Sequence, residues 1–147
     1  MRSFITLLFL VGFFALASAQ DIGKIDSRAK DVALVQLLSS PSKYNQQGIR
    51  VFGIYYWSRD GSFLFLTREH YEAFDTASAL ELAVGEQYLP TTHKTAESLK
   101  GRSVFLEGKF EATRGISGGP ILLPITRILV GGTASGPPAE LQPKSGH

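Results

Sequence analysis

The sequence contains no cysteine. This absence excludes disulfide bonds, thiolate nucleophiles, cysteine-ligated zinc, iron–sulfur clusters and a lipidated N-terminal cysteine. The fold must therefore be held together by its apolar core alone. The 128 residues that follow position 19 suffice for this, because a domain of that length buries roughly two thirds of its unfolded surface.

The chain also lacks any marked excess or run of one kind of charge. Beyond position 19 it has 14 Lys and Arg residues against 13 Asp and Glu residues, and the two signs are interspersed. A protein that captures nucleic acid or an anionic membrane by electrostatic attraction needs a basic surface. We therefore do not expect a nucleic-acid partner.

Long apolar runs are missing except at the N-terminus, where one occupies residues 4–17. Arg2 precedes this run and an Ala-Ser-Ala sequence ends at Ala19, as in a secretory signal peptide that is cleaved before Gln20. A run of about 14 apolar residues is shorter than the ~20 that a membrane-spanning helix needs. We expect residues 1–19 to be a signal peptide, the processed protein to be secreted or periplasmic, and no stable membrane insertion after cleavage.

The remaining chain divides into a lead-in, one domain and a tail. Residues 20–30 are polar, and we expect a loose lead-in there. Residues 31–130 hold the apolar and β-branched segments and form the predicted domain. Residues 131–147 are dense in Gly, Pro and Ser and have little to bury, which predicts a disordered tail.

Within the domain, β-branched and aromatic residues concentrate in a few segments that we predict to be strands. These segments are residues 49–57, 62–67, 79–84, 102–112 and 121–129. Asp60-Gly61, between the first two, is the signature of a hairpin turn. Gly108 and Pro124 interrupt the last two strands, which predicts a bulge or bend at each.

Two short helical segments accompany these strands. Asp31 is a suitable cap for a helix whose apolar positions run from residue 32 to residue 38. Thr95 is a suitable cap for a single helical turn over residues 96–100. The first helix precedes all the predicted strands, and the second lies before the fourth strand.

Five short strands predict a mainly β fold: a small five-stranded OB-like barrel with a short N-terminal helix and a helical turn before strand four. Residues 37–53 (LLSSPSKYNQQGIRVFG) resemble the opening of OB-fold proteins, in which a helix, a Pro-x-x-Tyr turn and a glycine lead into the first strand. With the hairpin and residues 99–108 (LKGRSVFLEG), the region from 32 to 129 is similar to a family of small uncharacterised secreted bacterial proteins with an OB-fold-like barrel. OB barrels use one face and two loops to hold their ligands.

A polar segment, Arg-Glu-His-Tyr-Glu at residues 68–72, follows the second predicted strand. Two interpretations of this segment are open: an active site, or the polar end of a strand that leaves the barrel. His70 has no acidic or histidine partner at the helical spacing of a metal pair, and the other histidines are His93 and His147. We interpret the segment as the polar end of a strand.

Two further motifs resemble functional sites but do not have the pattern that those sites need. Tyr55, Tyr56 and Trp57 do not form one stacking platform with Arg59, because neighbouring side chains of a strand point to opposite faces. The glycine-rich residues 115–119 lack the pattern of a phosphate-binding loop or a nucleophile elbow. We expect a hairpin loop there.

These patterns favour a non-catalytic binding or interaction module whose ligand is an oligosaccharide, a peptide or a protein partner, without a cofactor or metal. The candidate contact residues lie near one end of the first hairpin: Tyr56, Arg59, Arg68, His70 and Tyr71.

Two alternatives remain open at this stage. One is an accessory or inhibitory subunit of another secreted protein. The other is a metal-dependent hydrolase of OB-nuclease type, which would need clustered carboxylates to hold its metal. The acids available near the hairpin are Asp60, Glu69, Glu72 and Asp75.

Overall fold

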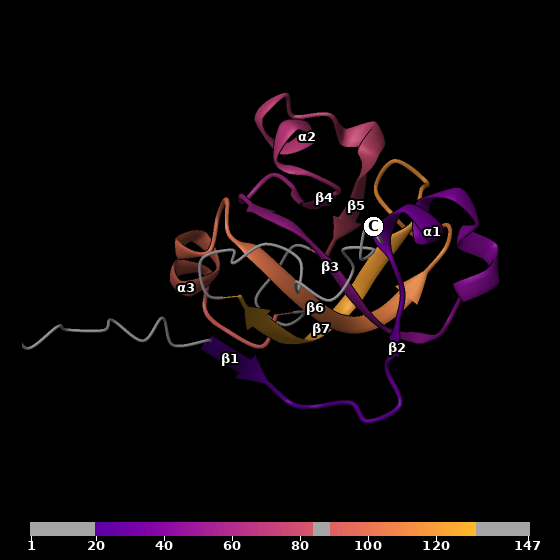
Figure 1. Cartoon of the computed structure of the whole chain (residues 1–147), viewed down its shortest axis with the longest axis horizontal. Helices are drawn as coiled ribbons and strands as arrows, with labels where there is room; N and C mark the ends of the chain where they lie inside the picture. Colours follow the sequence, from indigo (N-terminus) through magenta and orange to yellow (C-terminus); the bar gives the residue numbers. More distant parts are fainter. Residues whose placement is uncertain (1–19, 84–88, 132–147) are drawn as a thin grey trace, which may run out of the picture.

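The computed structural model describes residues 20–83 and 89–131 of the chain (Figure 1). The predicted signal peptide lies outside the described residues, as does the predicted tail beyond Gly131. Within the described part of the chain, no helix combines the length and apolar character needed to cross a membrane.

The described residues form seven strands, three of them long, and several short helical turns. In chain order they are β1 (Gln20–Gly23), β2 (Lys30–Asp31), α1 (Leu34–Ser39), η1 (Pro41–Tyr44), β3 (Gly48–Trp57), β4 (Ser62–Phe65), α2 (Arg68–Glu72), η2 (Thr76–Ser78), β5 (Ala79–Leu82), α3 (His93–Ser98), β6 (Ser103–Glu111) and β7 (Ile121–Val130). The five predicted strands correspond to β3 to β7, so the prediction of a mainly β chain is confirmed.

Strands β3 to β7 close into a barrel. β3 pairs antiparallel with β4 and with β6, and β4 pairs antiparallel with β5. β7 completes the circle, because it runs parallel to β5 and antiparallel to β6. The predicted five-stranded OB-like barrel is therefore confirmed, with β1 and β2 added outside it.

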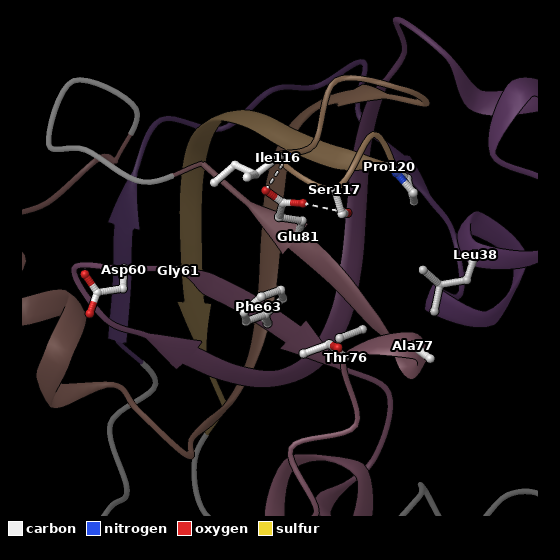
Figure 2. A pocket seen from close by; sticks show the side chains of 11 residues that line it. Leu38, Asp60, Gly61, Phe63, Thr76, Ala77, Glu81, Ile116, Ser117 and Pro120 are labelled. Atoms are coloured by element: carbon white, nitrogen blue, oxygen red, sulfur yellow. Dashed lines mark hydrogen bonds between the residues drawn. The ribbon is translucent and has the colours of Figure 1, made fainter.

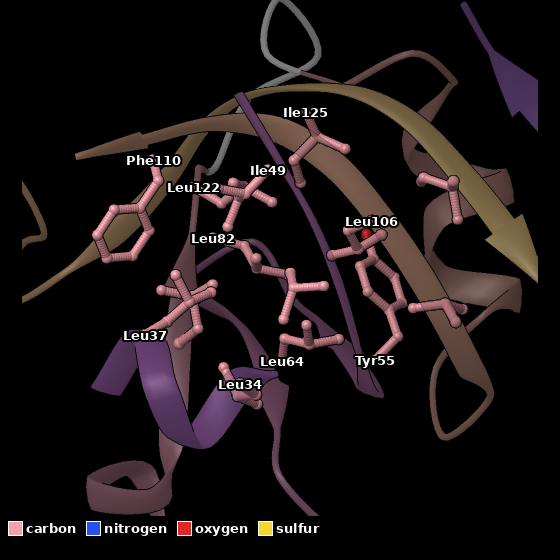
Figure 3. Close-up of a cluster of buried hydrophobic side chains, with 14 of the residues drawn as sticks. Leu34, Leu37, Ile49, Tyr55, Leu64, Leu82, Leu106, Phe110, Leu122 and Ile125 are labelled. Carbon is pink, nitrogen blue, oxygen red and sulfur yellow. The ribbon is translucent and has the colours of Figure 1, made fainter. Parts of the chain in front are cut away.

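The core fills the inside of this barrel with the inward-facing side chains of all five strands. Tyr55, Leu64 and Leu106 are fully buried there, and their side chains meet in the interior (Figure 3). Leu34 and Leu37 of α1 are also buried and close the barrel at one end. Full burial of a leucine side chain stabilises a fold by roughly 1.5–3 kcal/mol, so α1 contributes substantially despite its length of six residues.

The bulge and bend predicted at Gly108 and Pro124 are found opposite one another. The β6–β7 register shifts on both sides of Gly108, leaving Leu123 and Pro124 outside the ladder. A Cβ on Gly108 would lie 2.5 Å from the carbonyl oxygen of Pro124, so only glycine fits this close approach. The bulge coils the two long strands, which allows the barrel to close.

The lead-in expected at residues 20–30 is corrected by the structure, because both of its ends pair with the barrel. β1 pairs antiparallel with β7, and β2 pairs parallel with β3. Between them the chain crosses the outer face of β6, where the Asp26 N–H donates to Glu107 Oε2 at 3.1 Å. We call residues 20–31 the N-terminal arm.

A row of alternating charges fastens this arm to the barrel. The residues of this charged row are, from β2 across to β1, Asp31, Arg50, Glu107, Arg127 and Asp21. The oxygen–nitrogen distances between successive members are 3.3, 2.7, 3.1 and 2.7 Å. Each acid at the end of the row belongs to the arm, so the arm is held at both ends by arginines of the barrel.

The short helices differ from their predicted limits. α1 begins at Leu34, and Ala33 precedes it without a side-chain cap, because Asp31 belongs to β2 and contacts Arg50 instead. α3 begins at His93, where the Thr92 side chain accepts from the Thr95 N–H. The segment 68–72 is the helix α2 rather than the end of a strand, because the Thr67 hydroxyl accepts from the His70 N–H and caps its first turn.

Candidate binding groove

A groove lies on the outer face of β4 and β5. Strand alternation turns Leu64 and Leu80 into the core, so Phe63, Ala79 and Glu81 point outward. The two strands pair directly, with Phe63 opposite Glu81, and together they make the floor of the groove.

Loops and helices from distant parts of the chain form the walls of this groove. Its volume is about 470 Å³ (Figure 2). The lining residues are Leu38 of α1, Asp60 and Gly61 of the β3–β4 hairpin, Phe63, Ala79 and Glu81 of the floor, Thr76 and Ala77 of η2, and Ile116, Ser117 and Pro120 of the β6–β7 loop. The β3–β4 hairpin and the β6–β7 loop thus both border the floor. In Figure 2, Asp60 and Leu38 lie at opposite ends, with Phe63 and Glu81 between them.

Glu81 fixes the β6–β7 loop against the floor. Its Oε1 accepts the Ile116 N–H at 2.7 Å, and its Oε2 accepts the Ser117 hydroxyl at 3.4 Å (Figure 2). Gly115 approaches so closely that an added Cβ would lie 2.5 Å from Glu81 Oε2. The carboxylate therefore sets the loop conformation and leaves the Ile116 side chain, 83% exposed, at the rim.

The lining is mainly apolar and carries negative charge. Asp60 and Glu81 are its only charged residues, and neither makes an ion pair with the described part of the chain. Arg114 and Glu81 both line an adjoining hollow of about 230 Å³, but the ion pair of Arg114 is with Glu111, whose carboxylate lies 3.3 Å from its guanidinium. Among the described residues, no ion pair therefore neutralises the charge of the two groove acids.

An aromatic cluster adjoins the groove on the same outer face. Its members are Tyr56, Phe63, Phe65, Tyr71 and Phe74. Neighbouring rings lie 5.0–6.4 Å apart in tilted and edge-on arrangements, distances at which aromatic pairs attract one another. Phe63 belongs to both the cluster and the groove floor, so the two features share one side chain.

Two of the five predicted contact residues, Tyr56 and Tyr71, belong to this aromatic cluster, and a third, Arg68, contacts it. The rings of Tyr56 and Tyr71 lie 6.3 Å apart, and the Arg68 guanidinium lies 5.5 Å from the Tyr71 ring centre. Lys100, which the sequence did not single out, lies 4.9 Å above the Tyr56 ring. These pairs are cation–π contacts that stabilise the packing of α2 and the β3–β4 hairpin.

The other two predicted residues lie apart from these contacts. His70 has local partners, with Nδ1 2.8 Å from Thr67 Oγ1 and Nε2 3.9 Å from Asp75 Oδ2. Arg59 is exposed in the β3–β4 hairpin. None of the five predicted contact residues is among those that line the groove. Their role in binding stays a prediction.

Sequence reasoning identified the position of the hairpins but missed the residues that make the groove. Residues 115–119 form a hairpin loop as predicted, yet the loop also supplies Ile116 and Ser117 to the lining. The available signal was Ile116 itself, because a large apolar residue at a glycine-rich loop tip is exposed. Nothing local marked Glu81 as the partner of that loop, since 35 residues separate it from Ile116.

The alternation predicted for Tyr55, Tyr56 and Trp57 is confirmed. Tyr55 and Trp57 are buried inside the barrel, while Tyr56 is half-buried in the outer aromatic cluster. Burial raises the pKa of Tyr55 well above its ordinary value of 10.0. Its phenol therefore stays neutral and is a core residue rather than a contact residue.

No group of three or more His, Asp or Glu side chains suited to a metal ion occurs within residues 20–83 and 89–131. The comparisons with known proteins add no relative: no protein-family model matches the chain, and no curated protein sequence matches it.

Proposed function

We propose that this chain is an exported, non-catalytic binding module that holds its ligand in the groove between the β3–β4 hairpin and the β6–β7 loop. The observation that carries this proposal is the groove itself, about 470 Å³ in volume and mainly apolar. Ligand pockets of proteins have volumes of roughly 300–1,000 Å³ and combine apolar walls with a few polar groups.

The position of the groove supports the same conclusion. It lies over the second and third strands of the barrel and between the loops that follow the first and fourth strands. OB folds bind their ligands at this face and between these two loops. The analogy supports a location, whereas the chemistry of the ligand depends on the lining residues.

Export is supported by the sequence of residues 1–19 and by the resemblance to small secreted bacterial proteins. N-terminal sequencing of the protein recovered outside the cytoplasm tests it, and we expect the mature chain to begin at Gln20. A chain that keeps residues 1–19, or that begins elsewhere within the domain, would contradict this part of the proposal.

A binding role suits the groove better than catalysis. Asp60 and Glu81 are the only acidic or basic side chains among its described lining residues, and both oxygens of Glu81 already accept hydrogen bonds from the β6–β7 loop. General acid–base chemistry needs a group free to exchange a proton with the substrate. The metal-dependent hydrolase considered above has no cluster of candidate ligands in the described residues to support it.

A groove-filling variant tests the location. Ala77 is exposed and lines the groove, so Ala77→Trp places an indole in it without disturbing the core. Ala73, exposed but outside the lining, provides the matched control Ala73→Trp. With the mature chain titrated against oligosaccharides and short peptides, we expect NMR shift changes at the groove residues, lost in Ala77→Trp and kept in Ala73→Trp.

The same experiment can contradict the proposal. Shift changes centred on another surface, such as the exposed pair Phe52 and Phe105, would place the binding site elsewhere. Binding that survives Ala77→Trp unchanged would have the same consequence. A stable protein partner that blocks neither loop would favour the accessory-subunit alternative.

A further inference from the structure

Among the residues that the structure describes, the groove lining has acidic residues and no basic ones. Asp60 at one end and Glu81 on the floor carry carboxylates, and none of the described lining residues is Lys, Arg or His. Arg59 neighbours Asp60 in the chain but does not line the groove, and Arg114 is paired with Glu111. A ligand with positive charge is therefore favoured at this site, and phosphate or sulfate groups are repelled.

The rest of the lining favours apolar groups on the ligand. Leu38, Phe63 and Ile116 present apolar surface from three separate elements, with Pro120 and two alanines between them. A sugar ring needs several hydrogen-bond partners for its hydroxyl groups, because buried polar groups without partners cost free energy. The described lining has few such partners, because the oxygens of Glu81 already hold the β6–β7 loop and only Asp60, Thr76 and Ser117 add further polar side chains.

We propose that the groove takes an extended polypeptide segment in which apolar side chains are flanked by lysine or arginine. The inference rests on the proposed binding function and specifies its ligand. The apolar side chains pack against the surface between Leu38 and Ile116, while the cationic side chains lie near the carboxylates of Asp60 and Glu81, whose charge attracts them. Lysine and arginine suit such a site because their long aliphatic stems also cover apolar surface.

Defined peptides test this ligand class directly. Three hexapeptides share valine at alternate positions and carry lysine, serine or glutamate at the others, and a neutral oligosaccharide and a single-stranded oligonucleotide complete the set. Titration of the mature chain is expected to show the order lysine, then serine, then glutamate peptide. Added salt should weaken the lysine peptide most, since screening acts on exposed charges.

Asp60→Asn isolates the charge from the shape of the groove. The change replaces the Asp-Gly pair of the hairpin turn with Asn-Gly, which suits the turn equally well, so the fold is preserved. We expect binding of the lysine peptide to weaken by about two- to fivefold, as for loss of an exposed ion pair. The glutamate peptide should bind no more weakly than before. The control Glu97→Gln removes an exposed acid of α3, outside the lining, and should change neither.

The outcomes separate the ligand class from the binding function. If the oligosaccharide binds and Ala77→Trp blocks it while the lysine peptide does not bind, the inference is overturned and the proposed function stands. Equal affinity for lysine and glutamate peptides, unchanged in Asp60→Asn, also overturns the inference alone. If no probe binds in a manner that Ala77→Trp blocks, both are overturned.

Discussion

Glu107 and Arg127 form a buried ion pair on adjacent strands, with Arg127 Nη1 3.1 Å from Glu107 Oε1. The same carboxylate oxygen accepts from Arg50 Nε at 2.7 Å, and Arg127 in turn donates two hydrogen bonds of 2.7 Å to Asp21. The Glu107 side chain is fully buried, although it points away from the barrel interior. The N-terminal arm contacts this pair at two points, because the Asp26 N–H donates to Glu107 and the Asp21 carboxylate pairs with Arg127.

Glu107→Gln should destabilise the whole domain. The substitution leaves two arginines around a neutral amide, and breaking a buried ion pair from one side costs about 3–5 kcal/mol. We expect the lower end, about 3 kcal/mol, because Arg50 is 28% exposed and both arginines keep an aspartate partner. Urea unfolding measures the loss, and Glu97→Gln on exposed α3 is the matched control. An unchanged unfolding midpoint would show that the charged row contributes nothing to stability.

The stability of the protein should fall in acid, and Glu107 should account for part of the fall. Burial raises the pKa of Glu107, but the Asp26 N–H and the two arginines outweigh it and hold this pKa below the ordinary value of 4.5. As the pH falls below that value, the unfolded chain binds more protons than the folded one, so the free energy of unfolding decreases as the pH is lowered. Well above pH 4.5, the contribution of Glu107 to the free energy of unfolding is constant.

Urea midpoints at pH 7, 5 and 3 test this dependence. The wild-type midpoint should drop between pH 5 and pH 3, and the drop should be smaller in Glu107→Gln, which lacks the titrating group. Asp21 also has a lowered pKa, because Arg127 donates to its carboxylate, so some acid sensitivity should remain in the variant. Equal slopes in the two proteins would contradict the role given to Glu107.

Phe74 adopts a left-handed backbone conformation, with φ +50°, at the end of α2. Its ring lies 5.0 Å from that of Tyr56, so packing in the aromatic cluster offsets the conformational strain. Phe74→Ala and Phe74→Gly both remove the ring, but only glycine also relieves the strain. We expect the glycine variant to be the more stable of the two by about 1 kcal/mol.

The neighbouring position provides the control for this comparison. Ala73 has ordinary right-handed geometry, with φ −78° and ψ −7°. Ala73→Gly should therefore lower stability, by about 0.5–1 kcal/mol. Thermal unfolding of the wild type, Phe74→Ala, Phe74→Gly and Ala73→Gly measures these differences in stability. If the alanine protein is the more stable one at residue 74, as it is at residue 73, backbone strain at Phe74 is not significant.

Local composition was sufficient to predict the barrel strands. β3 and β6 are rich in β-branched and aromatic residues, and the Gly108 bend could be read from a glycine within an alternating strand. The short helices were harder, because the sequence offers several caps within a few residues. Thr92 and Thr95 are both suitable caps, and their hydroxyls lie 3.2 Å apart, so only the packing of α3 decides between them.

The groove and the charged row could not be predicted because their contacts are distant in sequence. Arg127 is 106 residues from Asp21, and neither lies in a pattern that points to the other. Glu81 looked like the solvent-facing residue of a short strand, and its function in holding the β6–β7 loop appears only when β5 and that loop are brought together. Polar residues that pair across a fold leave no periodic signal.

Ser62→Ala should stabilise the protein, although it removes a polar group. Ser62 is 1% exposed and lies opposite Trp57, and its hydroxyl has no hydrogen-bond partner in the described residues. A buried hydroxyl without a partner loses its hydration without compensation, so its removal should raise the free energy of unfolding by about 1 kcal/mol.

Ser58→Ala, four residues away in the same hairpin, is the contrasting variant. Its hydroxyl donates to the Gly61 carbonyl at 2.7 Å and accepts the Gly61 N–H at 3.1 Å, so its loss should lower stability by about 1 kcal/mol. Chemical denaturation of both variants measures the two signs, and a loss of stability in Ser62→Ala would mean that the hydroxyl is satisfied within the barrel.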